Sequence, residues 1–286
     1  MGRDFRAVPM ALETLLIALA LPVLNAIFLA LAGFLQLKKF SMTWSGWTEA
    51  VRAGADVPIN LALAQAAGVC LLFIFAFPHK GREAGFLEAV HVRPLAGGIV
   101  AVCFAAGLFL QFSLAEVGNV AQEVWPLAFD ELARRYQMLN PTTWWGGMSA
   151  LVAFVLVAPV TEELVFRGWL LPILQGRYGT RAALVWSSLL FGIVHGWPGA
   201  IYATLGGLVL GVVALRTKST LASIALHAGI NATPLLLPVT LVRVEGFNTL
   251  SDRVEHIGLW VILVSILVVA GLLTVLWRST GEPHEG

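Results

Sequence analysis

The sequence predicts an all-α fold, a polytopic bundle of about eight transmembrane helices. Of its 286 residues, 58% are hydrophobic and only 12% are charged, whereas an ordinary soluble domain has roughly 25% charged residues. The mean hydropathy is +0.82. Long apolar runs recur along the chain without the ten-residue alternation of membrane β-barrel strands. Because open strands would leave amide groups unpaired in lipid, helices are expected throughout.

Eight runs are long enough to cross a bilayer of about 30 Å at about 1.5 Å per residue. They lie near residues 10–37, 58–77, 95–115, 147–174, 181–197, 200–215, 220–240 and 257–277. The fifth and sixth runs are short and are separated only by Trp197, Pro198 and Gly199. They are expected to form either a tight helical hairpin or a partly re-entrant pair.

The longest polar interval extends from about Glu116 to Thr143 and mixes charged with aromatic residues. It predicts an amphipathic helix, either at the headgroup level or outside the membrane. Three parts follow from this pattern. Residues 1–145 hold the N-terminal transmembrane helices and the amphipathic connecting segment, residues 146–240 form a membrane core, and residues 241–286 hold a C-terminal transmembrane helix and a short tail.

The charge balance argues against nucleic acid as a partner, and the apolar composition favours a lipid bilayer. Lys and Arg total 18 against 17 acidic residues, so there is no basic excess that would favour nucleic acid. The expected surroundings are a lipid bilayer, and we expect an integral membrane protein of the cell (inner) membrane. The sequence leaves the oligomeric state open.

Three ionisable side chains interrupt the apolar sequence of the fourth run, namely Glu162, Glu163 and Arg167. A charge at the centre of a lone helix costs roughly 2.5–3.5 kcal/mol even on the lower insertion scales, so such residues face a protein interior or a wet cavity. Glu163 and Arg167 are four residues apart and can pair on one helical face. Glu162 is rotated by about 100° and has no basic residue three or four positions further on. Glu162 is therefore the better candidate for a base.

A purely structural interpretation of these three residues also exists. They could form a buried ion-pair cluster that fixes the helix register, or the span could end near the interface, where charged side chains reach the headgroups.

Two histidines in later apolar runs favour a chemical role. A lone histidine in such a run is more often a packing residue, but His195 and His227 accompany the paired acids. His227 and Asn231 are four residues apart, so their side chains can converge from one helix face.

These side chains suit the hydrolysis of a peptide bond inside a membrane. A carboxylate in a cavity can act as a general base toward water, and histidine and asparagine side chains can donate to a developing oxyanion. The same inventory could instead bind zinc through Glu162, His195 and His227, with a water in the fourth position. The residues by themselves leave both possibilities open.

Three motifs follow one another in successive hydrophobic segments: Glu162-Glu163-x-x-x-Arg167, Phe191-x-x-x-His195 and His227-x-x-x-Asn231. Together they resemble the signature of the CPBP family, which includes the eukaryotic CaaX-prenyl endopeptidase of the Rce1 type and bacterial Abi proteins. The resemblance covers about Leu151 to Pro238, and none of the motif positions departs from it.

The resemblance implies an intramembrane protease whose catalytic core is residues 146–240. It implies that Glu162 and His195 activate water, that His227 and Asn231 form an oxyanion hole, and that the pair of Glu163 and Arg167 supports the site. It favours a glutamate-dependent mechanism with no cofactor, zinc being the alternative. The implied substrate is a membrane-associated or lipidated, CaaX-like protein or peptide.

Two other functions remain as alternatives. One is a non-catalytic membrane scaffold or immunity-type protein of the same family, against which the complete set of six residues argues. The other is a proton-coupled transporter, because intramembrane ionisable side chains also mark proton paths. The paired halves with broken helices that many transporters have are not evident in the sequence.

Overall fold

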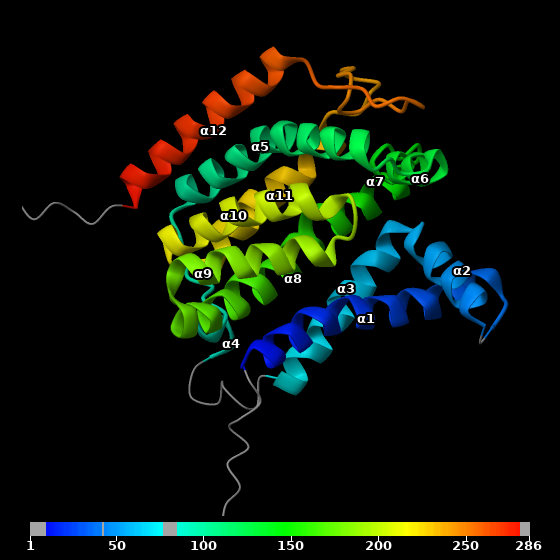
Figure 1. Cartoon of the computed structure of the whole chain (residues 1–286), viewed down its shortest axis with the longest axis horizontal. Coiled ribbons are helices and arrows are strands. Elements are labelled where there is room, and N and C mark those ends of the chain that lie inside the picture. The colour runs from blue at the N-terminus through cyan, green and yellow to red at the C-terminus, as the bar shows by residue number, and fades with distance from the viewer. Residues whose placement is uncertain (1–9, 42, 77–84, 281–286) are drawn as a thin grey trace, which may run out of the picture.

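The computed structural model describes residues 10–41, 43–76 and 85–280, and every regular element within them is a helix (Figure 1). This confirms the all-α transmembrane bundle. The elements are α1 (Met10–Leu37), α2 (Trp44–Ala55), α3 (Pro58–Ala76), α4 (Phe86–Ala89), α5 (Gly97–Val124), α6 (Phe129–Leu139), α7 (Trp144–Ala150), η2 (Leu151–Val157), α8 (Ala158–Glu163), η3 (Leu164–Leu170), α9 (Leu171–Val194), α10 (Gly199–Thr217), α11 (Thr220–Leu236) and α12 (Leu259–Ser279).

Five helices of the described chain are long and apolar enough to cross a membrane, or up to six if α2 and α3, which meet at 106°, count as one span. The predicted count of about eight is not confirmed. One reason is that α11 has only 17 residues. Another is that Trp144–Val194 counts once, as a helical stretch of 51 residues. The backbone of Gly179, with φ 76° and ψ 166°, is not helical and divides this stretch into two helices. The ring centres of Phe166 and Phe191, on either side of this break, are 5.1 Å apart, so the chain turns back on itself there.

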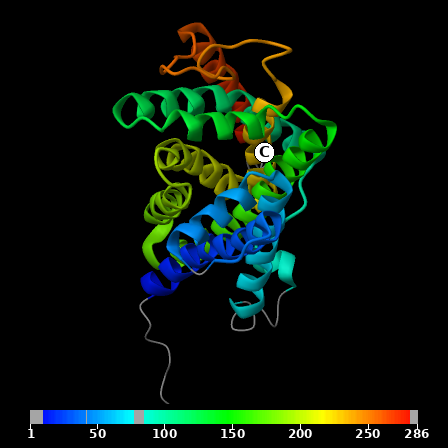
Figure 2. The same cartoon turned by 90° about the vertical axis from the view of Figure 1, so that its right-hand side faces the viewer.

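The helices form a layered bundle. Figure 1 shows α12 beside α5 at one edge, α9, α10 and α11 in the middle, and the group α1–α3 at the other edge. The view turned by 90° also separates α5 and α12 from α1–α3 (Figure 2). Helix α3 packs against η2, α7 and α8, so the N-terminal group borders the segment that carries the acidic residues.

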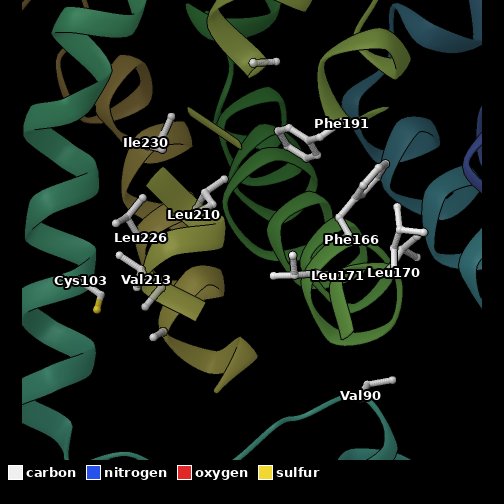
Figure 3. Packing of buried hydrophobic residues seen from close by; sticks show 14 of the residues in the cluster. Val90, Cys103, Phe166, Leu170, Leu171, Phe191, Leu210, Val213, Leu226 and Ile230 are labelled. Atoms are coloured by element: carbon white, nitrogen blue, oxygen red, sulfur yellow. The ribbon is translucent and has the colours of Figure 1, made fainter. Parts of the chain in front are cut away.

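The main hydrophobic core lies where α5, α10, α11 and the η3–α9 segment meet (Figure 3). Helices α5 and α11 cross very closely at two glycines. A Cβ atom on Gly229 would lie 2.1 Å from the carbonyl oxygen of Phe104, and one on Gly107 would lie 2.0 Å from that of Leu226. Small residues are needed for such an approach between membrane helices, and the approach places α11 against the core.

The third predicted span ends later than expected. Helix α5 continues to Val124, whereas the apolar run ends near residue 115, so the first part of the polar interval is helical. The last turns of α5 carry Glu116 and Glu123, which hold the segment between α11 and α12. His256 of that segment lies 2.7 Å from Glu116 through Nδ1 and 3.1 Å from Glu123 through Nε2. The hydrogen bonds of His256 with the carboxylates, first that with Glu116 and next that with Glu123, raise the pKa of His256 above its ordinary value of 6.5. The amphipathic helix expected in this interval is α6, and its depth relative to the membrane stays a prediction.

Candidate active site

The acidic pair lies on an unusual stretch of helix. The short α8, which ends with Glu162 and Glu163, lies between two π-helical segments, η2 and η3. At the end of each segment an amide bonds to the carbonyl five residues earlier, and a proline follows, Pro159 or Pro172. A proline has no N–H and crowds the carbonyl four residues before it, so a wider turn relieves the conflict.

Glu163 and Arg167 form the ion pair that their spacing predicted. Arg167 Nη1 lies 2.8 Å from Glu163 Oε1, and both side chains are fully buried. Arg167 Nη2 also donates to the carbonyl of Gly207 at 2.9 Å, and its guanidinium lies 4.3 Å from the ring centre of Phe191. A Cβ on Gly207 would lie 3.2 Å from this guanidinium. The pair therefore ties α8 and η3 to α10.

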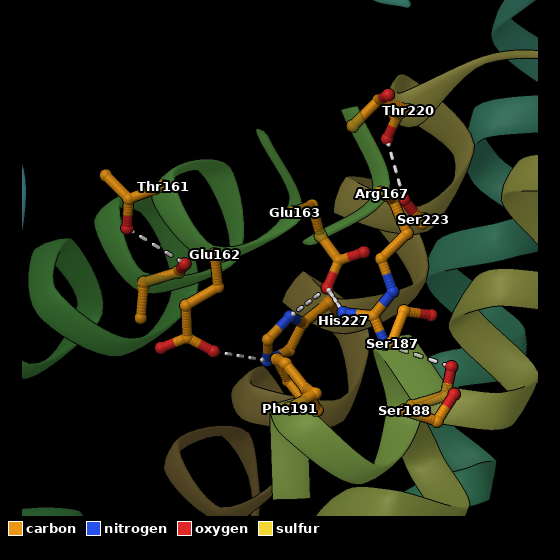
Figure 4. Close-up of polar contacts among 12 residues, drawn as sticks. Thr161, Glu162, Glu163, Arg167, Ser187, Ser188, Phe191, Thr220, Ser223 and His227 are labelled. Carbon is orange, nitrogen blue, oxygen red and sulfur yellow. Dashed lines mark hydrogen bonds and ion pairs between the residues drawn. The ribbon is translucent and has the colours of Figure 1, made fainter. Parts of the chain in front are cut away.

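His227 connects this pair to α11. Its Nδ1 lies 3.0 Å from Glu163 Oε1 (Figure 4). An ionised carboxylate can only accept hydrogen bonds, so Nδ1 carries the hydrogen of this contact. Glu163 thus accepts from Arg167 and His227 through the same oxygen, and the ring of His227 is held with Nε2 toward Glu162.

Glu162 points away from the ion pair and toward other helices, as expected from its position on the helix. Gln65 Nε2 donates to its Oε1 at 2.6 Å. Its Oε2 lies 3.7 Å from His195 Nε2 and 3.9 Å from His227 Nε2. Oε2 is buried and receives no hydrogen bond from the described residues. Both imidazoles therefore face one carboxylate oxygen at distances too long for direct hydrogen bonds.

His195 follows α9 as its C-terminal cap. Its Nδ1 lies 2.7 Å from the carbonyl of Phe191, and a carbonyl can only accept. Nδ1 therefore carries a hydrogen, and in the neutral ring Nε2 has its lone pair available. That lone pair faces the same space as Glu162 Oε2.

Asn231 is held by the backbone of η2. In a π-helical pattern the carbonyl of Phe154 would bond to the nitrogen of Pro159, which has no hydrogen. Asn231 Nδ2 donates to this carbonyl at 2.8 Å. Because an amide nitrogen has two hydrogens, one N–H of Asn231 stays available.

A cavity of about 380 Å³ brings most of the predicted residues together, and Glu162, His195, His227 and Asn231 line it. Glu163 and Arg167 are not among its lining residues and lie behind His227. A second cavity, of about 330 Å³, adjoins the first toward α6 and the segment 246–255. Both cavities share Gln111, Leu114, Leu139, Tyr202 and Pro234.

Sequence reasoning missed Gln65. The signal was an amide side chain within the apolar run of α3, and a buried amide requires a partner. Nothing in the run indicated that this partner would be Glu162, 97 residues further on.

Among the described residues, no three His, Cys, Asp or Glu side chains are grouped as ligands of a metal ion. The choice between zinc and a metal-free mechanism stays a prediction.

Residues 143–233 match a protein family described as type II CAAX prenyl endopeptidase Rce1-like. This segment is similar to that family and contains all six residues of the three motifs. The chain is similar to CAAX prenyl protease 2 of Rattus norvegicus, with 29% identity over 128 residues. That alignment covers 45% of this chain and 38% of the rat protein, so the chain spans well under half of this relative. No solved structure matches the chain.

Proposed function

We propose that this Rce1-like protein is an endopeptidase that hydrolyses a peptide bond of a membrane-associated or lipidated, CaaX-like substrate. The observation that carries the proposal is the position of Glu162 Oε2, which is 3.7 Å from His195 Nε2 and 3.9 Å from His227 Nε2 on the wall of one cavity. Separations above about 3.5 Å between polar atoms suit a bridging water. Such a water is the nucleophile of the proposed reaction.

Glu162 and His195 activate this water. Oε2 of Glu162 and Nε2 of neutral His195 are both acceptors, so each can accept one hydrogen of the water. As the water oxygen attacks the carbonyl carbon, its proton passes to Glu162. When the carbon–nitrogen bond breaks, the departing amine takes this proton, and the other fragment is left as a carboxylic acid. That acid gives the second proton of the water to His195 or to solvent and becomes a carboxylate. The same groups serve first as base and then as acid.

His227 and Asn231 stabilise the charge that develops on the carbonyl oxygen. Asn231 offers its second N–H. Nδ1 of His227 already donates to Glu163, so Nε2 can donate only when the ring carries both hydrogens. In that state the charges of His227 and Arg167 balance those of Glu162 and Glu163. A balanced set of charges suits a buried site, where an uncompensated charge is costly.

The test is cleavage by purified protein in detergent. A panel of prenylated CaaX peptides and candidate membrane substrates is compared between the unmodified protein, Glu162→Ala, His195→Ala and the control Glu49→Ala. Glu49 is exposed on α2, so its variant should keep full activity. Loss of general acid–base catalysis should lower the rate by about 10²–10⁴-fold. Cleavage that survives both site substitutions would exclude this site.

The same assay decides the role of zinc. We expect activity to persist after strong chelation in protein shown by elemental analysis to lack zinc. Loss of activity that zinc restores would instead assign Glu162, His195 and His227 as its ligands. The cell (inner) membrane is the proposed location, which fractionation of cells expressing a tagged chain would test.

A further inference from the structure

Helix α3 places one polar side chain in the cavity, and that side chain contacts the proposed base. Of the two amide side chains on α3, Asn60 bonds to the carbonyl of Gly54 at the helix start. The other, Gln65, lines the cavity and bonds to Glu162. Gln65 lies outside the Rce1-like segment 143–233, and it belongs to none of the three motifs.

The chemistry of this contact fixes its direction. An ionised carboxylate only accepts, so the amide nitrogen of Gln65 must face Oε1 of Glu162 at 2.6 Å. The hydrogen bond holds the orientation of the carboxylate, because Oε1 is engaged while Oε2 faces the two imidazoles.

We propose that Gln65 is a positioning residue for Glu162. Its hydrogen bond to Oε1 aims Oε2 at the space between His195 and His227. This inference rests on the proposed function in so far as it concerns catalysis, but the effect of Gln65 on the hydrogen bonding of the Glu162 carboxylate is independent of turnover.

Two substitutions of Gln65 distinguish the effect of its hydrogen bond from the effect of its side-chain volume. Gln65→Leu removes the donated hydrogen bond and keeps a side chain of similar size. Gln65→Glu keeps the shape but replaces the N–H donor with a second carboxylate, which cannot donate to the first when it is ionised. Gln175→Leu is the control, because Gln175 is exposed on α9 and bonds to Thr180 instead of the cavity groups.

The kinetic test measures cleavage of the best substrate of the panel between pH 5 and 9. Gln65→Leu should lower kcat about 10- to 100-fold, the size of one hydrogen bond to a charged group, with a smaller change in KM. Gln65→Glu, which keeps the shape but lacks the N–H donor, should lower kcat at least as far. Values of kcat and KM for Gln65→Leu that equal those of Gln175→Leu across this pH range would overturn the inference.

A spectroscopic arm does not require turnover. Infrared spectra contain the carboxylate stretching band of Glu162, which is assigned by its absence in Glu162→Gln. This band should shift in Gln65→Leu, because the carboxylate loses a hydrogen bond that it accepts at Oε1. If the unmodified protein cleaves no substrate, the proposed function fails, and the position of this band still decides the role of Gln65. An unshifted band would refute that role.

Discussion

Substituting Gly229 with alanine should damage both stability and activity. In an ordinary helix this change stabilises by up to about 1 kcal/mol. Here the new Cβ would lie 2.1 Å from the carbonyl oxygen of Phe104 on α5. Ordinary contact begins near 3.4 Å, so α11 and α5 must separate by about 1.3 Å at this point, a strain of the overpacking kind. The obstructing atom is backbone, so no change of side-chain rotamer relieves the contact.

Overpacking of this kind costs about 1–3 kcal/mol, which should lower the melting temperature of the detergent-solubilised protein by several degrees. The activity should fall more steeply than the stability. His227 and Asn231 flank Gly229 on α11, and a displacement of about 1 Å at a catalytic group can cost about 10²-fold in rate. The measurements are a thermal melt followed by intrinsic fluorescence and kcat with the best substrate.

Gly271→Ala is the matched control. Gly271 is also helical, but no atom lies within 4 Å of a Cβ placed there. This variant should melt at the same temperature as the unmodified protein or slightly higher, with unchanged kcat. If Gly229→Ala behaved like Gly271→Ala, the close crossing of α5 and α11 would not be what holds His227 and Asn231, the proposed oxyanion donors, in place.

Three further changes have defined outcomes. Asn231→Ala should lower kcat about 10²–10³-fold, the loss expected for an oxyanion-hole donor, which is its proposed role, and an unchanged kcat would remove this residue from the site. Arg167→Met should destabilise by about 3–5 kcal/mol, because Glu163 stays buried without the charge of Arg167 and keeps only its contact with His227, and an unshifted thermal melt would contradict this. Because the pKa of folded His256 is raised, its contribution to stability is full below pH 6.5 and is lost as pH rises through the raised value. His256→Gln should therefore melt below the unmodified protein in acid, with the difference closing at alkaline pH, and a constant difference would argue against the two carboxylates as the cause.

The long spans were predictable because lipid imposes a simple rule on composition and length. The predicted run 10–37 coincides with α1, and the run 58–77 differs from α3 by one residue. Helix α2 was missed, because Trp44–Ala55 is too short and too polar to stand out as a span. The pairing of Glu163 with Arg167 was predictable because both residues are on one helix, where spacing alone determines proximity.

Contacts between distant helices were harder to predict. The position of Glu162 on its helix indicated a partner elsewhere, but it did not distinguish Gln65 from any other polar residue of the bundle. The anchor of Asn231 depends on a π-helical segment that ends before Pro159, and hydropathy contains no signal for such a turn. When two residues lie on different helices, the way the helices pack determines whether their side chains are in contact.

The cavity beside Glu162 is lined both by residues within the segment 143–233 and by residues outside it. The groups proposed for chemistry all lie within residues 143–233, whereas Leu61 and Gln65 of α3 and Gln111 and Leu114 of α5 lie outside this segment. Substitutions in α3 and α5 could therefore alter which peptides fit while the acids and imidazoles stay unchanged. Two proteins with identical motifs could then cut different substrates, and exchanging these two helices between relatives would be a direct way to transfer selectivity.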